Sequence, residues 1–321
     1  MSRFANLHRG LDELGVRFDS GQSSLMEKSL TLTLSKIQET VYSEVMAQKI
    51  VPVAMPEGTG LSTIEHYQAE EFGELQLIAP GADDLPSSGE KLTQVQRSVA
   101  KYGGKFSYSL QDFENWNRAN QNGFSYAFDS RRGNNARRIA ERKIDAVVFS
   151  EGDPLDTRIK GFFGSVLAPV TGMTGGWASA TETQILDDLK LLFQKSYDGS
   201  GGEIEPDTIV LPSAEYGILK TTFRTNTDRT LLKLFSEELN ISIMRSARLD
   251  SVTSAVNSVS AVPVALCFKF DSELLSLHIP RPFEVRPGKW TVNDKYQVNY
   301  YLDFAGLFID FLPNIAMMDL S

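Results

Sequence analysis

Hydrophobic residues recur at helical spacing in several segments of the chain. One such segment starts near Leu34 and should end before Pro52, because proline cannot continue a helix. A short helix over Leu110–Asn120 is predicted behind Ser109, which can cap it. An amphipathic helix is predicted over Thr181–Tyr197.

The longest predicted helix covers residues 125–150. Its apolar stripe consists of Ala136, Ile139, Ala140, Ile144, Val147 and Val148. Basic residues occupy the remaining faces, and Gly152-Asp153-Pro154 should end the helix.

Other segments show the pattern of strands. Short β-like runs separated by turn residues predict a long hairpin over residues 50–80. Residues 92–110 alternate apolar and polar side chains, which predicts a strand with one face on a core. The glycine-rich stretch 152–180 is interpreted as a loop region or domain crossover. Thr208–Leu211 is a predicted buried strand, residues 283–318 return to long β-like runs, and the mixed order predicts an α+β fold.

Length and composition are those of a globular protein. The chain has 321 residues, of which 41% are hydrophobic and 23% charged, so it can form one large or two interleaved domains. No apolar run approaches the roughly 20 residues of a membrane helix, so we predict no membrane contact. Met1–Gly15 lacks the apolar segment of a signal peptide.

Residues suited to catalysis or metal binding are scarce. The chain has one cysteine and three histidines, and no nucleotide-binding, zinc-protease or serine-hydrolase motif. Cys267 lies in an apolar strand and is interpreted as a small core residue. His66 and His278 are interpreted as ordinary sheet positions. We therefore predict no enzyme, no catalytic residue, no metal site and no cofactor.

The charge of −9 is unevenly distributed. Residues 50–90 contain no Lys or Arg and carry a local charge of −8, whereas residues 118–143 carry +5. Both segments can be solvated faces, or they can be interaction surfaces that pair within or between subunits, and the helix can also face packaged DNA. The candidate residues of the acidic loop are Glu57, Glu65, Glu70, Glu71 and Glu74. Those of the basic helix are Arg131, Arg132, Arg137, Arg138, Arg142 and Lys143.

Several short stretches occur in the order found in one family of proteins. They are Ala82-Asp83-Asp84-Leu85-Pro86, residues 102–110 (YGGKFSYSL), residues 136–145 (ARRIAERKID), Gly161-Phe162-Phe163-Gly164, residues 206–216 (PDTIVLPSAEY) and Leu277-His278-Ile279-Pro280. Together with the order of predicted elements, this set resembles the major capsid proteins of tailed bacteriophages. These proteins share the Hong Kong 97 phage capsid fold with encapsulins.

The resemblance implies a division of the chain into four parts. Residues 1–48 would be an N-terminal arm and residues 49–90 an extended loop. Residues 91–180 with 281–321 would form a peripheral domain around a spine helix near 125–150, and residues 181–280 an axial domain.

The resemblance also implies a function. Copies of the chain would assemble into pentamers and hexamers that form an icosahedral shell around double-stranded DNA, which is bound without sequence preference. Scaffolding, portal and decoration proteins would be further partners, and the protein would be in the virion after assembly in the host cytoplasm. The alternative is an encapsulin-like compartment that encloses a cargo enzyme.

Two features depart from the pattern of some relatives. Residues 50–90 contain no lysine, so we predict no Lys–Asn isopeptide crosslink from the extended loop. No long scaffolding segment precedes the arm, so we expect a separate scaffolding protein or a prosegment that has already been removed.

Overall fold

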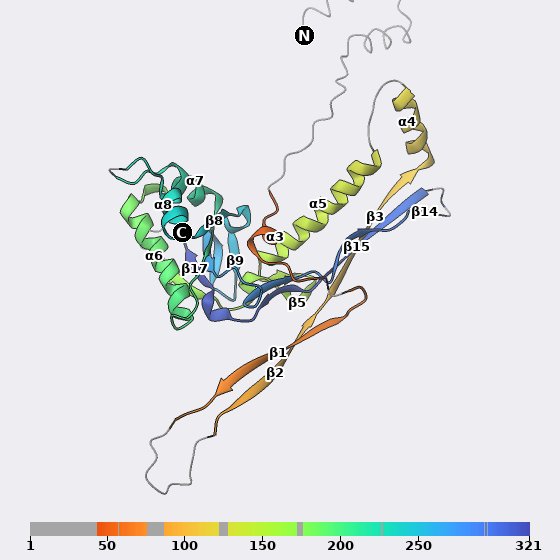
Figure 1. The fold of residues 1–321 in the computed structure, drawn as a ribbon. Coiled ribbons are helices and arrows are strands. Elements are labelled where there is room, and N and C mark those ends of the chain that lie inside the picture. The colour runs from red at the N-terminus through yellow and green to blue at the C-terminus, as the bar shows by residue number, and fades with distance from the viewer. Residues whose placement is uncertain are drawn as a thin grey trace, which may run out of the picture.

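A long two-stranded hairpin extends from the body of the protein (Figure 1). The computed structural model describes residues 44–321 except 57, 76–86, 122–127, 172–175, 226, 292 and 294. Most of the predicted helix before Pro52 therefore lies outside the described residues. Its end is α3 (Ala47–Ile50), which stops before Pro52 as expected.

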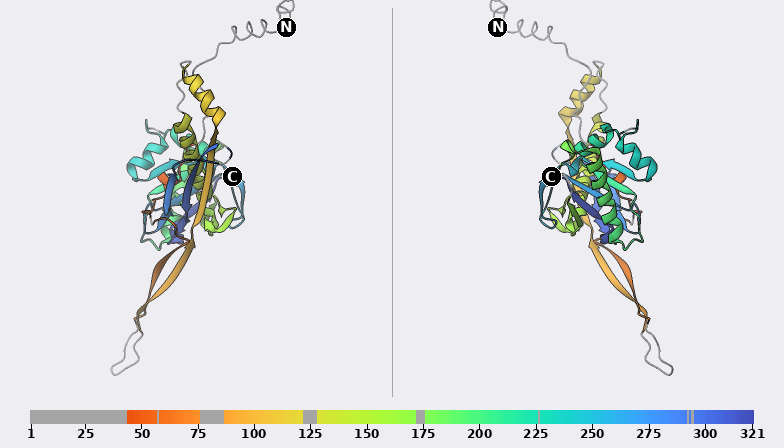
Figure 2. Two further views of the ribbon diagram at one scale, coloured as in Figure 1. Left: turned by 90° about the vertical axis from the view of Figure 1, so that its right-hand side faces the viewer. Right: turned by 90° about the vertical axis from the view of Figure 1, so that its left-hand side faces the viewer.

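The hairpin consists of β1 (Thr63–Phe72) and β2 (Gly89–Ser98), antiparallel and paired along their full length. The predicted single strand over residues 92–110 is wrong, because its first part belongs to β2 and its second part is β3 (Ala100–Ser109). β2 and β3 are joined by Val99, which is buried in a small cluster with Phe308. The hairpin then projects away from the body (Figure 2).

β3, which continues β2 beyond Val99, forms a sheet with the C-terminal part of the chain. β3 pairs with β15 (Lys295–Phe304), whose other side pairs with β13 (Arg281–Val285) and β14 (Lys289–Trp290). After β3 come α4 (Leu110–Gln121) and α5 (Phe128–Val148), which confirm the two helices predicted there. Ser109 and Asp112 cap α4 reciprocally, as the Ser109 hydroxyl accepts from the Asp112 amide at 3.2 Å.

The apolar stripe of α5 packs into the large core, with one exception. Ala136, Ala140, Ile144, Val147 and Val148 are buried, whereas Ile139 is 49% exposed. The prediction for Ile139 is therefore wrong, because no described element covers this side of the helix.

A second, five-stranded sheet has the order β6-β17-β11-β7-β8. Its strands are β6 (Ala168–Thr171), β17 (Ala316–Asp319), β11 (Val264–Phe268), β7 (Thr208–Leu211) and β8 (Ser242–Arg245). Alternate residues face two cores: Val210, Leu266 and Met317 face the core that contains α5, and Ile209, Cys267 and Met318 face the other. β6 and β17 belong to the segments expected to form the peripheral domain, and the other three strands belong to the expected axial domain. The two expected domains therefore share this sheet. The boundaries between these domains stay predictions.

Three helices pack on the second core: α6 (Glu182–Gly199), α7 (Ser213–Thr221) and α8 (Leu231–Glu238). α6 confirms the predicted amphipathic helix and begins with a capping box of Thr181 and Gln184. None of the described helices is long and apolar enough to cross a membrane.

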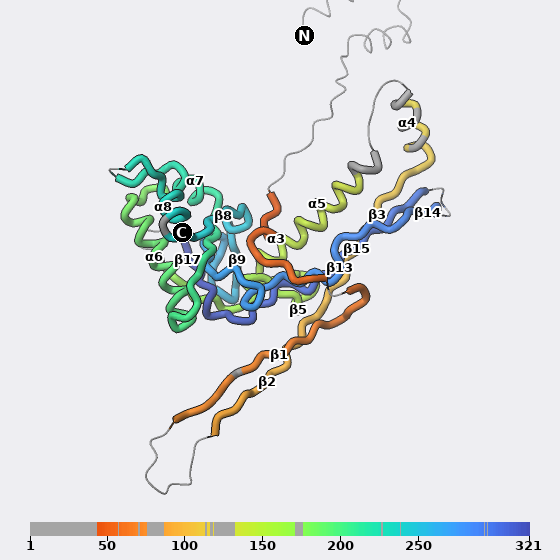
Figure 3. The backbone as a smooth tube through the Cα atoms, viewed as in Figure 1, coloured from red at the N-terminus to blue at the C-terminus, as the bar shows by residue number. Residues whose placement is uncertain are grey.

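Short elements complete the fold (Figure 3). The strands are β4 (Gly152–Asp153), β5 (Asp156–Lys160), β9 (Val252–Ser254), β10 (Val259–Val262), β12 (Leu275–His278) and β16 (Gly306–Ile309). The 3₁₀ turns are η1 (Phe162–Gly164), η2 (Trp177–Ser179), η3 (Ala247–Leu249) and η4 (Leu312–Asn314). The glycine-rich stretch 152–180 thus contains strands as well as loops.

Gly161 explains one of the short motifs. A β-carbon at this position would lie 2.1 Å from the carbonyl oxygen of Val147 at the end of α5. Phe162 and Phe163, which follow, are fully buried. Glycine lets the chain pass against the helix end while both rings enter the core.

Candidate interaction surfaces

The acidic residues of the hairpin lie on a ribbon that is exposed along most of its length. Glu65, Glu70 and Glu71 belong to β1, and Glu74 follows it. Glu57 and the side chain of Glu70 lie outside the described part of the structure. The carboxylate of Glu65 accepts hydrogen bonds from the amides of two glutamines of β2, Gln94 and Gln96.

The outer half of the hairpin is poorly stabilised by its own contacts. Glu71 lies directly opposite Glu90 in the register, and like charges in this position repel. Tyr67, Leu92 and Phe72 are 66%, 65% and 56% exposed. Isolated two-stranded hairpins are marginally stable in water. A surface that supplies cations and covers these apolar side chains would stabilise this one.

Arg132, near the start of α5, faces the sheet of β3 and β15. The guanidinium of Arg132 donates to the carbonyl of Ser107 at 2.6 Å and lies 4.4 Å from the ring centre of Tyr108. The backbone of Arg131 belongs to α5, but its side chain lies outside the described part. Arg132 therefore holds α5 on the sheet.

The middle of α5 carries the most exposed cations. Nε of Arg137 lies 2.8 Å from Oε1 of Glu141, and the Arg137 side chain is 68% exposed. Arg138 is exposed beside Ile139, and Arg142 is half-buried. This helix face therefore presents positive charge around an exposed apolar side chain.

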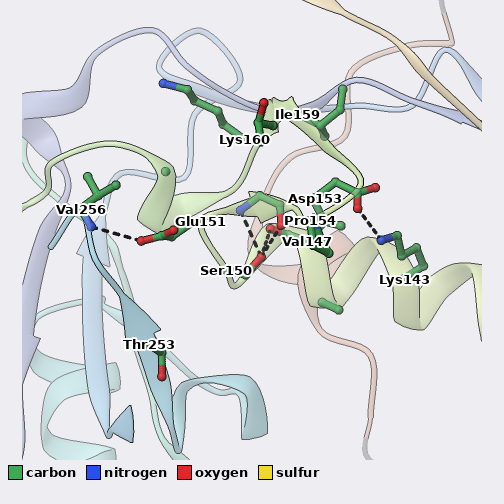
Figure 4. Close-up of a pocket in the computed structure, with 14 residues that line it drawn as sticks. Lys143, Val147, Ser150, Glu151, Asp153, Pro154, Ile159, Lys160, Thr253 and Val256 are labelled. Atoms are coloured by element: carbon green, nitrogen blue, oxygen red, sulfur yellow. Dashed lines mark hydrogen bonds and ion pairs between the residues drawn. The ribbon is translucent and has the colours of Figure 1, made fainter. Parts of the chain in front are cut away.

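Lys143 lines an open pocket of about 740 Å³ between the end of α5, β4, β5 and β9 (Figure 4). Its ammonium lies 2.8 Å from Oδ1 of the buried Asp153, whose other oxygen accepts from the hydroxyl of Tyr102. Burial opposes the ionisation of Asp153, but the bonds from Lys143 and Tyr102 lower its pKa. Burial and the bond to Asp153 raise the pKa of Tyr102. The charge of Lys143 is thus balanced within the chain.

Asp145 connects three parts of the chain, a role that the sequence analysis missed. This carboxylate is 3% exposed, and Oδ1 accepts from the backbone amides of Met46 at 2.9 Å and Ala47 at 3.0 Å. Oδ2 accepts from Nε of Arg248 at 3.0 Å. Asp145 therefore holds the start of α3 and the turn η3 on the spine helix. An acid within an apolar helical stripe was the signal that could have shown it.

A second basic surface, also missed, lies on the face of the β3–β15 sheet away from α5. Lys105 is paired with Asn299, Lys295 with Ser109, and Lys289 with Gln297, which puts these lysines on one face. The exposed cations of this surface are Lys101, Lys105, Arg286, Lys289 and Lys295, and the exposed acid is Glu284. None of these cations has an ion-pair partner among the described residues. We call this surface the basic sheet face.

The comparison with known families identifies the chain. The family model described as "Major capsid protein" matches residues 73–320. The chain belongs to this family. Membership indicates a structural role in a phage-like shell, as a component of the virion. No curated protein matches the sequence significantly.

Solved structures share the fold of this capsid protein. The capsid of the Myoviridae phage XM1 aligns with a TM-score of 0.79 and 14% identity over 96% of this chain and 100% of that chain. Mycobacterium phage Ogopogo aligns with a TM-score of 0.61 and 11% identity over 95% and 99% of the chains. The virus-like particle from Pyrococcus furiosus aligns at 0.52 and 12% over 85% and 91%. These matches confirm the phage capsid fold that the sequence motifs predict.

Cys267 has the environment of a core residue in this capsid protein. The thiol is fully buried in β11, and burial raises its pKa far above that of a reactive cysteine. Its interpretation as a small core residue is confirmed.

Proposed function

We propose that this capsid protein assembles into pentamers and hexamers that close an icosahedral shell around double-stranded DNA. The hairpin is the observation that carries the proposal. It is long and acidic, and its outer half is exposed on both faces. There Glu71 opposes Glu90, and neither forms an ion pair with a residue that the structure describes. A second copy of the chain supplies the missing surface in a closed assembly.

The hairpin would lie across a neighbouring subunit, with its acidic residues against basic ones. Two surfaces are candidates: the middle of α5 around Arg137 and Arg138, and the basic sheet face. The basic sheet face is favoured, because its cations have no described ion-pair partner, whereas Arg137 pairs with Glu141 and Lys143 with Asp153. Exposed ion pairs contribute only about 0.2–1 kcal/mol each, so charge would mainly set the register, and apolar contacts would supply cohesion.

The spine helix is then available for packaged DNA. Its basic residues would contact phosphates without sequence preference. Residues 181–280 would meet around the capsomer axis, and scaffolding, portal and decoration proteins would be further partners. Assembly would take place in the host cytoplasm.

Electron microscopy of the expressed protein tests the proposed assembly. We expect closed shells of one diameter in negative stain, with pentameric and hexameric units in the reconstruction. Monomers or open aggregates under all salt conditions would contradict the proposal. Shells from infected cells that contain a protein cargo and no DNA would favour the encapsulin-like alternative.

Charge reversal distinguishes the two candidate surfaces for the hairpin. We expect Lys101→Glu with Lys105→Glu to block assembly, and Glu71→Lys with Glu90→Lys to restore it in the same chain. Arg137→Glu with Arg138→Glu is the matched double reversal on α5. If that variant alone blocks assembly, the hairpin lies on the spine helix. If neither variant changes assembly or its salt sensitivity, the pairing is wrong.

DNA contact by the spine helix is tested separately. Neutralising Arg131 and the exposed Arg138, with Arg132 left in place because it holds α5 on the sheet, should lower the amount of DNA retained by shells at high salt. Each phosphate contact adds to the salt dependence. Retention equal to the unmodified protein would contradict this contact.

A further inference from the structure

The hairpin is joined to the body through a small hydrophobic cluster at its root. Val99, Ala305 and Phe308 form this cluster, and Leu61 and Ile64 pack against it. It is separate from the two large cores. Since few contacts hold a long ribbon here, a small change in interaction energy at the root changes how firmly the hairpin is held.

His66 of β1 contacts the body at this root. Its Nε2 lies 2.9 Å from Oδ1 of Asp310, directly after β16, and both side chains are 26% exposed. The imidazole also stacks on Phe308, with ring centres 5.7 Å apart. The amide of Gln68 donates to the backbone carbonyl and to the carboxylate of Asp310 at 3.4 Å. The contacts of Asp310 thus come from two successive inward positions of β1.

The contact between His66 and Asp310 depends on charge. Neither ring nitrogen of His66 has a well-oriented hydrogen bond to any residue that the structure describes. The short approach is therefore favourable mainly when the ring is an imidazolium facing a carboxylate. Histidine is the side chain that changes charge between pH 5 and 8.

Other charged groups surround the same ring of Phe308. Arg97 of β2 lies over it, with the guanidinium carbon 5.6 Å from the ring centre. His278 of β12 stacks on the ring at 3.9 Å, and its Nε2 lies 3.0 Å from the hydroxyl of Ser276.

Three further charged groups lie nearby, two on β5 and one on β1 itself. β5, which packs against β2, carries Asp156 and Arg158, and these are paired with each other at 2.8 Å. Glu65 lies at the alternate position of β1, on the opposite face of the ribbon. Among the groups that face His66, Asp310 is therefore the counter-ion.

We propose that His66 and Asp310 form a protonation-dependent clamp at the hairpin root. Charged His66 holds β1 on the segment after β16, and neutral His66 loosens the hairpin. The clamp acts within one copy of the chain and goes beyond the proposed shell function. In a shell it would couple pH to the freedom of the hairpin to reorient.

Hydrogen exchange followed by mass spectrometry tests the clamp in the purified full-length protein. Exchange is measured from pH 5.5 to 8, corrected for the intrinsic rate, and referred to peptides of β7 and β11. We expect amides of residues 61–72 and 89–99 to exchange about two- to fivefold more slowly at pH 5.5 than at pH 8, the range of a partly exposed ion pair.

Two variants and one control complete the test. His66→Gln and Asp310→Asn should each remove the pH dependence of exchange in the hairpin. If His66→Gln does not fold, the more conservative Asp310→Asn still tests the clamp. His278→Gln, which changes the other histidine on Phe308, should keep it.

The clamp is overturned by any of three results: no pH dependence in the unmodified protein, an unchanged dependence in both variants, or its loss in His278→Gln alone. Since exchange does not require a shell, failure of the clamp and failure of assembly are distinguishable.

Discussion

Replacing Asp145 by asparagine should release the start of α3 from the spine helix. The carboxylate accepts three hydrogen bonds, from the amides of Met46 and Ala47 and from Arg248. Asparagine has nearly the same shape as aspartate. In either orientation of its side-chain amide, however, the NH₂ group faces an N–H donor and cannot accept a hydrogen bond from it. One charge-assisted bond is lost, worth about 1.5–3 kcal/mol, and the others weaken. We expect the free energy of unfolding to fall by about 3 kcal/mol, within the range for breaking a buried ion pair.

Denaturant unfolding and hydrogen exchange measure this effect. The midpoint should fall with an unchanged slope, and the amides of Met46 and Ala47 should exchange faster than in the unmodified protein. Asp187→Asn is the matched control, since Asp187 is 45% exposed and pairs only with Lys190 on its own helix at 3.2 Å among the described residues. The control should lose at most about 0.5 kcal/mol. Equal stability of Asp145→Asn and Asp187→Asn would refute the anchoring role of Asp145.

Two further substitutions test the core. Glu215 is 7% exposed with Oε2 unpaired among the described residues, and burial, with Asp250 adding to it, raises its pKa above the ordinary 4.5. A carboxyl group with a raised pKa contributes stability at pH values below its ordinary pKa, and this contribution is lost as the pH rises. Glu215→Gln should therefore stabilise the protein near pH 7 by about 1 kcal/mol. Thermal melts from pH 4 to 8 should show a weaker dependence of stability on pH in this variant. Gly161→Ala should prevent soluble expression, because its β-carbon would lie 2.1 Å from the carbonyl oxygen of Val147. Gly133 of α5 is the control, since a β-carbon there would have no described atom within 4 Å. Gly133→Ala should be slightly stabilising in the same melts.

The periodic pattern predicted elements where one environment covers a whole segment. Thr208–Leu211 is buried throughout and was predicted with its observed bounds. Alternation over residues 92–110 continues on both sides of Val99, although the strand changes from the hairpin to the sheet there. An alternation of apolar and polar residues shows that a strand has two different faces. It does not show which other strand pairs with it. Ile139 shows the same limit for a helix, because its spacing fits the stripe but no described element covers it.

Charge clusters were visible in the sequence, but their partners were not. Lys143 meets Asp153 across the turn that ends α5, and Arg132 meets Tyr108 of a strand that precedes the helix. Such pairs depend on the tertiary fold. The basic sheet face is different, because Lys101 and Lys105 lie on the alternating outer positions of β3. Counting charge along alternate residues, instead of over contiguous windows, would have found it.

The geometry of the ribbon bears on the proposal that its two charged halves pair between different subunits. β2 and β3, which are separated only by Val99, continue in one direction in Figures 1 and 3. The acidic half of the ribbon therefore points away from the basic half. At about 3.3 Å per residue, Glu90 lies about 30 Å before Val99 and Lys105 about 20 Å after it. Their separation of about 50 Å exceeds the Debye length of about 8 Å several times, so the halves do not attract each other within one chain. A neighbouring copy displaced along the ribbon would bring them together, as the proposed pairing between subunits requires.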